Sequence, residues 1–474
     1  MKQKLIWSRY QKAIFDDIKN GKDGENTVVI ARAGSSKTTC LVEGVKYIPK
    51  KKKTLFVCFN KAIQETLEDR IGKSYIECRT NHSKGFSTIK NAFGSGVKLD
   101  QDKTLNITQS VLQEKGFKKL EIALSMCRAV DLCKSSLIDT PSKIDVLLDK
   151  FDIETFSMER EDFISTICQV MRKCKEVKNV VDFTEMLWFP YIFGLGFEKY
   201  DRVVLDEAQD VSPAQLHIAL SSCKKDGRIL AVADDRQTIN TFAGVDINSV
   251  NLLIDRLNAK VLPLPISYRC ATSIIKLAQE IVPDIEAATY ADEGTITDIK
   301  EKDFLTEVRP GDFILSRVNA PLIYYALALL RMNVPANILG RDIGNGLAYM
   351  IKKSGKETVP EFQRWLDLWK GFEIARLQAK GRDPILVIDK AACLETLCEG
   401  ARNLDDVRDN IKKLFTDGDD SSRVILSSIH RSKGAERNRV FLCMWTLRDT
   451  STEELNIKYV GITRCKTHLF RVNK

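Results

Sequence analysis

Residues 27–39 read TVVIARAGSSKTT, and the rest of the chain is organised around this stretch. The apolar run at its start predicts a buried strand, and the polar turn after it leads into a helix near Lys37 and Thr38. Successive backbone N–H groups at such a helix start, with the positive end of the helix dipole, form a cradle for anions. In such a loop the lysine reaches the β and γ phosphates and the threonine binds Mg²⁺. The stretch therefore predicts a phosphate-binding loop.

This loop departs from the strict pattern G-x-x-x-x-G-K-[ST] at both glycine positions, because Ala31 stands at the first and Ser36 at the second. If the backbone at Ser36 is left-handed, a side chain there costs about 1 kcal/mol or more. An ordinary polar turn between a strand and a helix is the alternative interpretation. The choice between a phosphate-binding loop and an ordinary turn depends on the motifs that follow later in the chain.

The bulk composition is typical of a soluble globular protein. The 474 residues are 44% hydrophobic and 29% charged, enough for about three or four domains. No window approaches the roughly 18 uncharged apolar residues of a membrane span, and residues 1–8 lack the apolar core of a signal peptide. We therefore expect a cytoplasmic protein. The net charge of +9 is compatible with a polyanionic partner but is weak evidence for one.

The thirteen cysteines are scattered through apparent strands and helices, as expected of buried thiols in a reducing compartment. Cys127 and Cys133, like Cys168 and Cys174, are six residues apart, which raises the possibility of a metal or iron–sulfur site. Six positions at about 100° each put two thiols roughly 120° apart around a helix. Such a pair does not easily share a ligand shell.

Periodicity along the chain predicts an α/β fold. Buried strands are expected from residue 27 and at 54–59, 202–205 and 228–233 in the first half, and at 313–317, 424–426, 440–443 and 468–470 in the second. Helical spacing dominates residues 95–180. Strands alternating with helices favour doubly wound parallel sheets with a helical insertion.

Two acidic segments follow predicted strands. Residues 206–210 read DEAQD, in which Asp206 can hold Mg²⁺ and Glu207 can polarise an attacking water. An acidic helix start stabilised by the helix dipole is the alternative. The second segment begins at residue 234 and reads DDRQTI. In it Gln237 can sense a γ-phosphate through hydrogen bonds. Phe242, shortly after it, can stack on a base, although a lone aromatic residue more often belongs to a core.

The order and spacing of these segments resemble those of superfamily 1 helicases of the UvrD/Rep/PcrA type. The matching stretches in the first half are Gln11, AGSSKT at 33–38, NKA at 60–62, TNHS at 80–83, DEAQD at 206–210, and DDRQTI at 234–239 with Phe242 and Gly244. Those in the second half are SYR at 267–269, SSIHRSKGAE at 427–436 and YVGITR at 459–464. The series covers almost the whole chain.

The resemblance implies ATP and Mg²⁺ as cofactors and assigns roles to individual residues. Catalytic roles fall to Lys37, Asp206, Glu207, Gln237, Arg269 and Arg464. Nucleotide contacts fall to Gln11, Ala33, Gly34, Ser35, Ser36, Lys37, Thr38, Thr39, Tyr268, Arg269, Glu436 and Arg464, with Mg²⁺ on Thr38 and Asp206. Nucleic-acid contacts fall to Asn60, Thr80, His82, Phe242, His430 and Lys433. Tyr268 is expected to pack on the adenine, and the two arginines to reach the γ-phosphate. Thr39 departs from the pattern, because relatives often carry there an arginine that sandwiches the adenine.

The resemblance also implies two RecA-like parallel-sheet motor domains with inserted helical subdomains. The first motor domain is expected at 1–90 and 180–262, with a helical insertion at 91–179. The second is expected at 263–340 and 421–474, with a reduced accessory helical subdomain at 341–420. ATP would draw the two domains together, and its hydrolysis would release them.

The function expected from the resemblance is an ATP-dependent DNA helicase or single-stranded DNA translocase that moves 3′ to 5′. DNA is favoured over RNA because DEAQD differs from the D-E-A-D of many RNA helicases. Expected partners are single-stranded DNA, duplex junctions and a loading, replication or repair protein, without a membrane. We expect a monomer in the cytoplasm of a bacterial or phage-infected cell, since the compact size is similar to that of phage helicases.

Two alternatives remain open. A nucleotide-gated nucleic-acid-binding protein with weak or lost ATPase activity is motivated by Ser36 and by the reduced accessory region. An ATP-driven nuclease is the other, suggested by the E-x-K spacing of residues 176–178, but it lacks a convincing carboxylate cluster beyond the predicted Mg²⁺ site.

Overall fold

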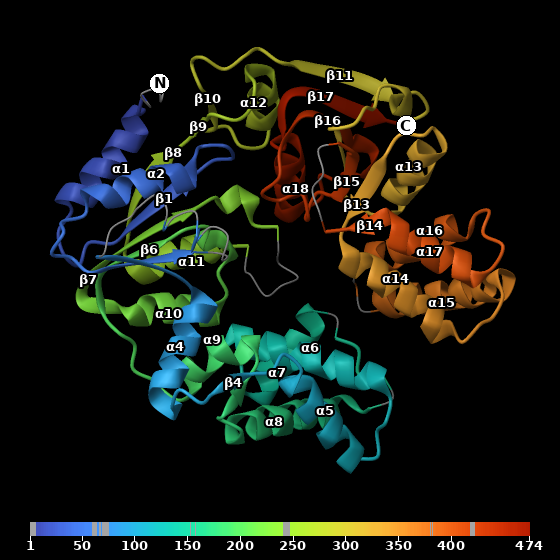
Figure 1. The fold of residues 1–474 in the computed structure, drawn as a ribbon, viewed down its shortest axis with the longest axis horizontal. Coiled ribbons are helices and arrows are strands. Elements are labelled where there is room, and N and C mark those ends of the chain that lie inside the picture. The colour runs from blue at the N-terminus through green and yellow to red at the C-terminus, as the bar shows by residue number, and fades with distance from the viewer. Residues whose placement is uncertain are drawn as a thin grey trace. The chain divides into compact units, whose positions relative to one another are not determined.

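The computed structural model describes residues 6–58, 64–65, 68, 75–151, 153–156, 158–239, 247–379, 381, 383–417 and 422–474. The chain divides into two compact units (Figure 1), residues 1–31 with 36–265 and residues 32–35 with 266–474. Four residues of the predicted phosphate loop, Arg32–Ser35, thus group with the second unit. We describe each unit by itself.

The first unit is built on a six-stranded sheet in the order β3-β2-β6-β7-β1-β8, in which every neighbouring pair is parallel. Its strands are β1 (Thr27–Ala31), β2 (Thr54–Cys58), β3 (Ile76–Thr80), β6 (Tyr200–Leu205), β7 (Cys223–Ala233) and β8 (Lys260–Leu264). The helices next to it are α1 (Arg9–Asn20), α2 (Lys37–Gly44), α4 (Asn81–Phe93), α10 (Pro213–Ser222) and α11 (Ser249–Leu257). Because parallel strands end at the same edge, the loops after β1, β6 and β7 share one edge of the sheet.

Helices cover both faces of this sheet, since successive residues of a strand point to opposite sides. Val29 of β1 packs in one cluster with Ile14 and Phe15 of α1 and with residues of α2. Val28, its neighbour along the strand, packs in a second cluster with Leu253 of α11 and residues of α10. This double cover explains why the strands read as continuous apolar runs.

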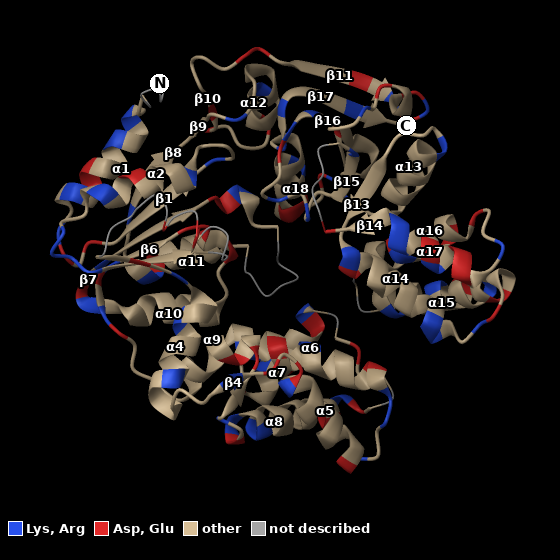
Figure 2. Cartoon of the chain, in the orientation of Figure 1, with Lys and Arg blue, Asp and Glu red and all other residues tan. Residues whose placement is uncertain are grey.

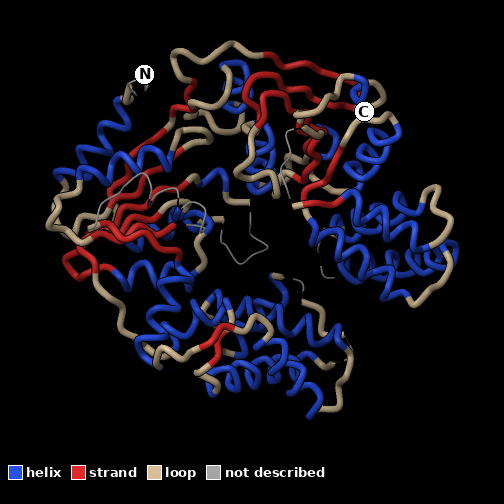
Figure 3. The backbone as a smooth tube through the Cα atoms, viewed as in Figure 1, coloured by secondary structure: helices blue, strands red, loops and turns tan. Residues whose placement is uncertain are grey.

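A helical region follows α4 in the first unit. It contains β4 (Lys98–Leu99), α5 (Lys103–Glu114), α6 (Leu120–Ser136), α7 (Pro141–Lys150), α8 (Arg160–Glu176), β5 (Val180–Val181) and α9 (Phe183–Ile192). In Figure 3 it is almost wholly helical. Its core includes Ile122, Met126 and Cys133 of α6 and Phe163 and Ile167 of α8, at the spacing that the sequence predicts.

The second unit contains a seven-stranded parallel sheet in the order β11-β17-β16-β12-β15-β13-β14. These strands are β11 (Thr295–Lys300), β12 (Phe313–Ser316), β13 (Ala336–Leu339), β14 (Phe415–Thr416), β15 (Val424–Ser428), β16 (Arg437–Cys443) and β17 (Cys465–Asn473). A short parallel pair, β9 (Ile266–Ser267) and β10 (Glu286–Ala287), precedes it in the chain. The two large parallel sheets confirm the α/β class.

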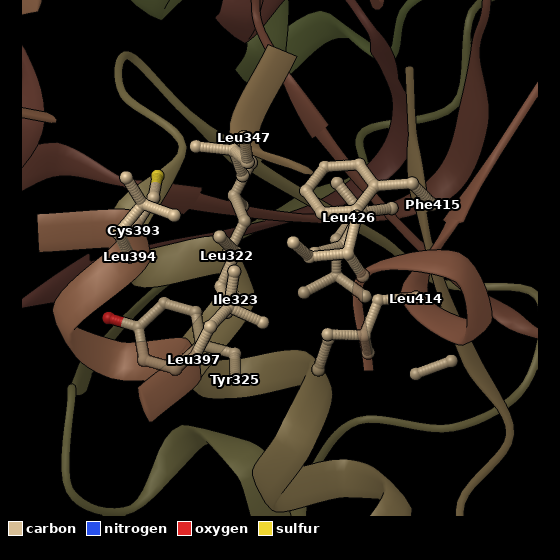
Figure 4. Packing of buried hydrophobic residues seen from close by; sticks show 14 of the residues in the cluster. Leu322, Ile323, Tyr325, Leu347, Cys393, Leu394, Leu397, Leu414, Phe415 and Leu426 are labelled. Carbon is tan, nitrogen blue, oxygen red and sulfur yellow. The ribbon is translucent and has the colours of Figure 1, made fainter. Parts of the chain in front are cut away.

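The helices of the second unit are α12 (Thr272–Gln279), α13 (Ala320–Arg331), α14 (Arg341–Ser354), α15 (Val359–Ala379), α16 (Ile385–Cys398), α17 (Leu404–Leu414) and α18 (Thr452–Ile462). Leu322 of α13, Leu347 of α14 and Leu397 of α16 lie in one core with Phe415 and Leu426 of the sheet (Figure 4). Acidic and basic residues are interspersed over α14–α17 (Figure 2). Among the described residues, no helix combines the length and apolar character needed to cross a membrane.

Several strands are longer than their apolar runs. The structure has β7 over Cys223–Ala233, where the sequence predicts only 228–233, and β17 over Cys465–Asn473, where it predicts 468–470. The added residues are largely polar, and pairing with a neighbouring strand holds several of them in the sheet, as between Leu442 and Arg471 of β17, whereas Cys223 is the one added residue of β7 with a partner in the register, Tyr200. Such pairing depends on the partner strand, so hydrophobic periodicity does not report it.

Candidate active site

The loop after β1 has the backbone of an anion cradle. Gly34 and Ser36 both have positive φ angles, of 74° and 59°, and α2 begins directly afterwards at Lys37. Ser36 therefore carries a side chain in the left-handed region, which is the condition for the backbone cost stated above. The buried Ser35 hydroxyl has no hydrogen-bond partner in the described part of the chain. Such an orphaned group fits a loop that closes around a polar ligand.

The acidic segment after β6 meets this loop within the first unit. The Thr38 hydroxyl donates a hydrogen bond of 2.8 Å to Oδ2 of Asp206. The Lys37 ammonium lies 3.5 Å from Oε2 of Glu207. Residues that are 168 or more positions apart in the sequence are thus joined at one edge of the sheet. The structure brings together the four residues on which the predicted phosphoryl chemistry depends.

Asp206 is a buried carboxylic acid whose pKa differs from its ordinary value. Burial raises the pKa of Asp206 to about 6, and the neighbouring Glu207 carboxylate adds to the rise. The Thr38 hydroxyl and the Lys37 charge oppose this effect without cancelling it. A carboxyl group that burial makes costly to ionise is one that a divalent cation stabilises.

Gln209 connects the acidic segment to the segment after β7. Its amide donates to Oε2 of Glu207 at 2.6 Å, and its side-chain oxygen accepts from the backbone N–H of Asp234 at 3.1 Å. Asp234 in turn accepts a hydrogen bond of 2.7 Å from the Gln237 amide. Glu207 and Gln237 are therefore linked through two buried residues. Gln209 lies within DEAQD and Asp234 within DDRQTI, but the sequence by itself indicates no role for either residue.

Gln11 is held at the start of α1. Its side chain accepts from the Ser8 N–H at 3.0 Å, while its own N–H donates to the Ser8 hydroxyl at 3.2 Å. This reciprocal capping box fixes the helix start. The cap orients Gln11, and the nucleotide contact that the family resemblance implies for it stays a prediction.

In the second unit, Arg269 and Glu436 form a close ion pair. Lys466 contacts the same carboxylate at 2.8 Å. Burial by itself raises the pKa of Glu436, but Lys466 and Arg269 outweigh it and hold that pKa below its usual value. Arg269 also donates to the carbonyl oxygen of Thr463 at 3.3 Å, next to Arg464 in the chain. The structure thus gathers Arg269, Glu436 and Arg464 as the sequence predicts, and it adds Lys466, for which the sequence gives no signal.

Arg464 is almost fully buried, with 1% of its surface exposed. Its Nε donates to the Val460 carbonyl at 3.1 Å and its Nη1 to the Ala435 carbonyl at 3.3 Å. Its Nη2 has no partner among the described residues. Burial, with the nearby charge of Arg269, lowers the pKa of Arg464 to about 10. A buried guanidinium with an unused donor fits an anionic ligand.

The loop residues that group with the second unit contact Tyr268, a predicted nucleotide residue, and Tyr459, for which the sequence predicts no such contact. Gly34 accepts a hydrogen bond of 2.8 Å from the backbone N–H of Tyr268. The Ala33 N–H donates to the Tyr459 hydroxyl at 2.9 Å. A Cβ atom on Gly34 would lie 2.6 Å from the Cβ of Arg269, so only glycine fits at this position. These contacts give Ala33 and Gly34 fixed backbone positions.

The predicted nucleic-acid residues are partly described. Asn60 and Phe242 lie outside the described residues. Thr80 caps α4 by accepting from the Ser83 N–H at 3.1 Å. Burial lowers the pKa of His82, and burial with the charge of Arg317 lowers the pKa of His430 to about 4. Both imidazoles are therefore neutral near pH 7 and suited to hydrogen bonding or stacking, not to pairing with phosphate as cations.

His430 and Lys433 lie in the loop between β15 and β16, and both are partly exposed. His82 lies in α4, with its ring centroid 6.1 Å from that of Phe183 in an edge-on arrangement. Thr39 lies in α2 and is also partly exposed. The roles expected of these residues stay predictions.

The donor set of the first unit fits Mg²⁺. Thr38 and Asp206 offer two oxygen ligands side by side, and Mg²⁺ commonly takes one or two protein oxygens together with waters and substrate phosphates. Groups of three or more metal-binding side chains are not found among the described residues. A strand–loop–helix cradle beside acidic residues at the ends of parallel strands defines the class of P-loop nucleotide-binding α/β proteins.

Comparison with known proteins identifies the family within this class. Residues 17–258, more than half of the chain, match the model of the UvrD/REP helicase N-terminal domain, and residues 400–472 match that of the UvrD-like helicase C-terminal domain. The chain therefore belongs to the UvrD/Rep family of helicases.

Curated relatives agree with this assignment. The chain is 26% identical over 506 residues to F-box DNA helicase protein 1 of Schizosaccharomyces pombe, covering 94% of this chain and 55% of that protein. It is 22% identical over 277 residues to DNA helicase II of Escherichia coli, covering 54% of this chain and 38% of that protein. With UvrD1 of Mycobacterium leprae, an ATP-dependent DNA helicase, it shares 24% identity over 304 residues, or 55% of this chain and 38% of that protein. The chain thus spans about half or less of the length of these relatives.

Proposed function

We propose that this protein is an ATP-dependent DNA helicase or single-stranded DNA translocase that moves 3′ to 5′. The observation that carries the proposal is the meeting of Lys37 and Thr38 with Asp206 and Glu207 in the first unit, at 3.5 and 2.8 Å. Phosphoryl transfer needs positioning and charge neutralisation more than covalent chemistry, and these residues supply both. The names of the relatives, all DNA helicases, support DNA as the nucleic acid.

In this proposal Thr38 and Asp206 hold Mg²⁺, which neutralises charge on the β and γ phosphates when it is bound. Lys37 leaves Glu207 for those phosphates, and Glu207 then orients the attacking water. Gln209 keeps the Glu207 carboxylate in place and links it to Gln237. The buried linkage ties the position of Gln237 to that of the acidic segment.

The family resemblance supplies the remaining part of the proposal. Arg269 and Arg464 act as arginine fingers on the γ-phosphate, and Glu436 contacts the nucleotide. Single-stranded DNA binds across both units, with Thr80 and His82 in the first and His430 and Lys433 in the second. Asn60 and Phe242 keep their proposed DNA contacts, as do Gln11 and Tyr268 their adenine contacts.

ATP hydrolysis with and without single-stranded DNA tests the proposal. We expect strong stimulation by DNA, and its loss in Lys37→Ala and in Glu207→Gln. Strand displacement on duplexes with a 3′ or a 5′ overhang then tests movement and polarity together. Stimulation by RNA alone, or by no nucleic acid, contradicts the proposal, and unwinding only from a 5′ overhang contradicts its polarity.

A second candidate is a nucleotide-gated DNA-binding protein with little turnover. The left-handed backbone of Ser36, with φ of 59°, favours it, because the loop carries strain that a glycine relieves. Replacing Ser36 with glycine separates the two candidates. A large rise from negligible hydrolysis favours the binding protein, whereas wild-type hydrolysis that changes by only a fewfold favours the motor.

A further inference from the structure

A basic pocket of the second unit lies at the edge of the seven-stranded sheet where β12 and β16 begin. Segments 309–312 and 436–439 line it together with Lys466, and its volume is about 410 Å³. This volume falls within the range of roughly 300–1,000 Å³ that is typical of small-molecule sites. Of the residues predicted to contact the nucleotide, only Glu436 lines the basic pocket, and the proposed mechanism gives the pocket no role.

Positive charge prevails among the side chains that line the basic pocket. Two carboxylates, Asp312 and Glu436, face four cations, Arg309, Arg437, Arg439 and Lys466. Nε of Arg439 lies 3.0 Å from Oδ1 of Asp312. Nζ of Lys466 lies 2.8 Å from Oε1 of Glu436. Each carboxylate thus has a cation of the pocket as its partner, and the lining side chains keep an excess of two positive charges.

Arg439 is held in place from three sides. Besides its contact with Asp312, it donates from Nη2 to the Glu307 carbonyl at 2.8 Å. Its Cζ lies 4.7 Å from the ring centroid of Phe470, a distance typical of a cation–π interaction. Asp312 is itself fixed, because it is 3% exposed and also accepts from the backbone N–H of Arg309 at 3.0 Å. The guanidinium of Arg439 therefore has a defined position at the pocket.

Arg437 is held at an irregular point of β16. Its Nη1 donates to the Glu436 carbonyl at 2.9 Å. The register of β16 with β17 shifts between Arg437 and Arg439, and such bulges are over-represented next to active sites. Cations that the protein already holds lose little conformational freedom when an anion binds. Arg309 complements them, because it is exposed and its guanidinium forms no hydrogen bond or ion pair with the described residues.

The charges of the basic pocket indicate the class of anion that it binds. Arginine forks bind the oxygens of a phosphate in pairs. A phosphate monoester carries about −1.5 to −2 charges near pH 7, which matches the excess of the pocket, whereas a carboxylate carries a single charge. We propose that the basic pocket binds a phosphoryl group at a site separate from the nucleotide site. The phosphoryl group comes either from a free phosphate compound or from the backbone of a nucleic-acid strand, and the proposal does not depend on ATP hydrolysis.

Binding of inorganic tripolyphosphate without Mg²⁺, measured by isothermal titration calorimetry, tests the site. The measurements use the full chain with Lys37→Ala, so that the phosphate loop of the first unit contributes little. In this background we expect Arg309→Met to weaken binding by about tenfold or more, because a hydrogen bond between charged groups is lost. Arg309→Lys keeps the charge but not the fork, and its affinity should lie between the two.

Arg331→Met is the matched control. Arg331 is also an exposed arginine of the second unit, on α13, and it lies outside the basic pocket. Its replacement removes the same charge and should leave tripolyphosphate binding unchanged. The thermal midpoints of Arg309→Met and Arg331→Met should both equal that of the parent chain, because both side chains are exposed. A loss of binding in Arg309→Met is then not a loss of folding.

A second measurement distinguishes the two sources of the phosphate. Binding of a single-stranded oligothymidylate to chains with Lys37 intact is followed by fluorescence anisotropy over a range of salt concentrations. Each phosphate contact of a single strand contributes about 0.7 to the slope of log K against log salt. If a nucleic-acid strand supplies the phosphate, Arg309→Met lowers the slope by about 0.7 and Arg331→Met does not. If a free compound supplies it, the slope is unchanged while tripolyphosphate binding falls.

Three results would overturn the inference. The first is equal tripolyphosphate binding, with equal salt slopes, in the chains with and without Arg309→Met. The second is an equal loss in Arg331→Met, because the effect would then be one of net charge. The third is that saturating Mg-ADP abolishes the tripolyphosphate binding that depends on Arg309, in chains with Lys37 intact, since the basic pocket would then belong to the nucleotide site.

Discussion

Lys134 and Arg464 are both buried cations, but their surroundings differ. Lys134 of α6 is fully buried, and its ammonium lies 3.1 Å from Oε1 of Glu185 and 3.4 Å from Oδ2 of Asp182. Burial by itself lowers the pKa of Lys134, but the nearby carboxylates outweigh this effect and raise it above its usual value. Arg464 has carbonyl partners and an unused Nη2, and it forms no ion pair among the described residues.

The difference shows that burial by itself does not reveal whether a cation belongs to the core or serves a site. Charge taken out of water must be compensated, either by the protein or by a ligand. For Lys134 the protein supplies the compensation, so this cation belongs to the helical core of the first unit. For Arg464 the protein supplies no ion pair among the described residues, and burial with the charge of Arg269 lowers its pKa, which is typical of a residue that serves a site.

The largest expected effect is the loss of ATP hydrolysis when Arg464 is replaced. We expect Arg464→Met to lower DNA-stimulated ATP hydrolysis by about 10³-fold or more, as for other arginine fingers. Its thermal midpoint should not fall, because the replacement removes a buried charge that has no ion pair among the described residues. Arg448→Met, at an exposed arginine paired with Asp383, is the control and should keep wild-type activity. If Arg464→Met kept its activity within tenfold of wild type, Arg464 would be a structural residue like Lys134. The two buried cations would then no longer differ in role.

Replacing Lys134 is expected to lower stability. We expect Lys134→Met to lower the free energy of unfolding by about 3 kcal/mol, because it leaves the buried Asp182 carboxylate without an ion pair among the described residues and leaves Glu185 paired with Lys103 alone. Urea unfolding followed by circular dichroism measures the loss. Lys143→Met, at an exposed lysine of α7, should change stability by less than about 0.5 kcal/mol. Equal effects of the two replacements would show that the buried pairs contribute little.

Asp206 extends the comparison to a buried anion. Its folded-state pKa of about 6 exceeds the ordinary value of 3.8, so its contribution to stability is present below pH 3.8 and is lost as the pH rises through 6. We therefore expect Asp206→Asn to raise the free energy of unfolding without Mg²⁺ at pH 8 by on the order of 1–2 kcal/mol, measured as a higher thermal midpoint, and to change it little at pH 4. Asp139→Asn, at an exposed carboxyl group, is the control and should be neutral at both pH values. A gain that does not depend on pH would exclude the ionisation as its cause.

The smallest expected effect is that of inorganic pyrophosphate on thermal stability. An anion that binds only the folded state at ten times its Kd stabilises it by about 1.4 kcal/mol, which corresponds to a few degrees. We expect a smaller shift in Arg464→Met, because its unused donor is gone, and an unchanged shift in Lys134→Met. Differential scanning fluorimetry at constant ionic strength measures the three shifts. An identical shift in wild type and Arg464→Met would mean that pyrophosphate does not use Arg464.

Much of the fold and the candidate site follows from local sequence. The run 27–39 gives β1, the loop and the start of α2, and the burial of Ile14, Phe15 and Ile18 follows helical spacing. The α/β class and the family assignment are confirmed. The domain boundaries and the roles of the site residues stay predictions.

Other features are not visible in local sequence. Residues 365, 368, 369 and 372 share one face of α15, yet Leu368 and Phe372 are exposed while Trp365 and Trp369 pack against the core. The spacing gives the face of the helix, but the packing of neighbouring elements decides which part of that face is covered.

The sequence by itself determined the segments, their order and the chemistry of their side chains, because these depend on residues that are close in the chain. The tertiary structure decided which charges are compensated. Lys134 reads like any other lysine of a helix, and it becomes a core residue only because α9 brings Asp182 and Glu185 against it. Arg464 has no such ion pair among the described residues, and two distant segments form the basic pocket of the second unit, for the same reason: contacts between distant segments are set by the packing of helices and sheets, which local sequence does not encode.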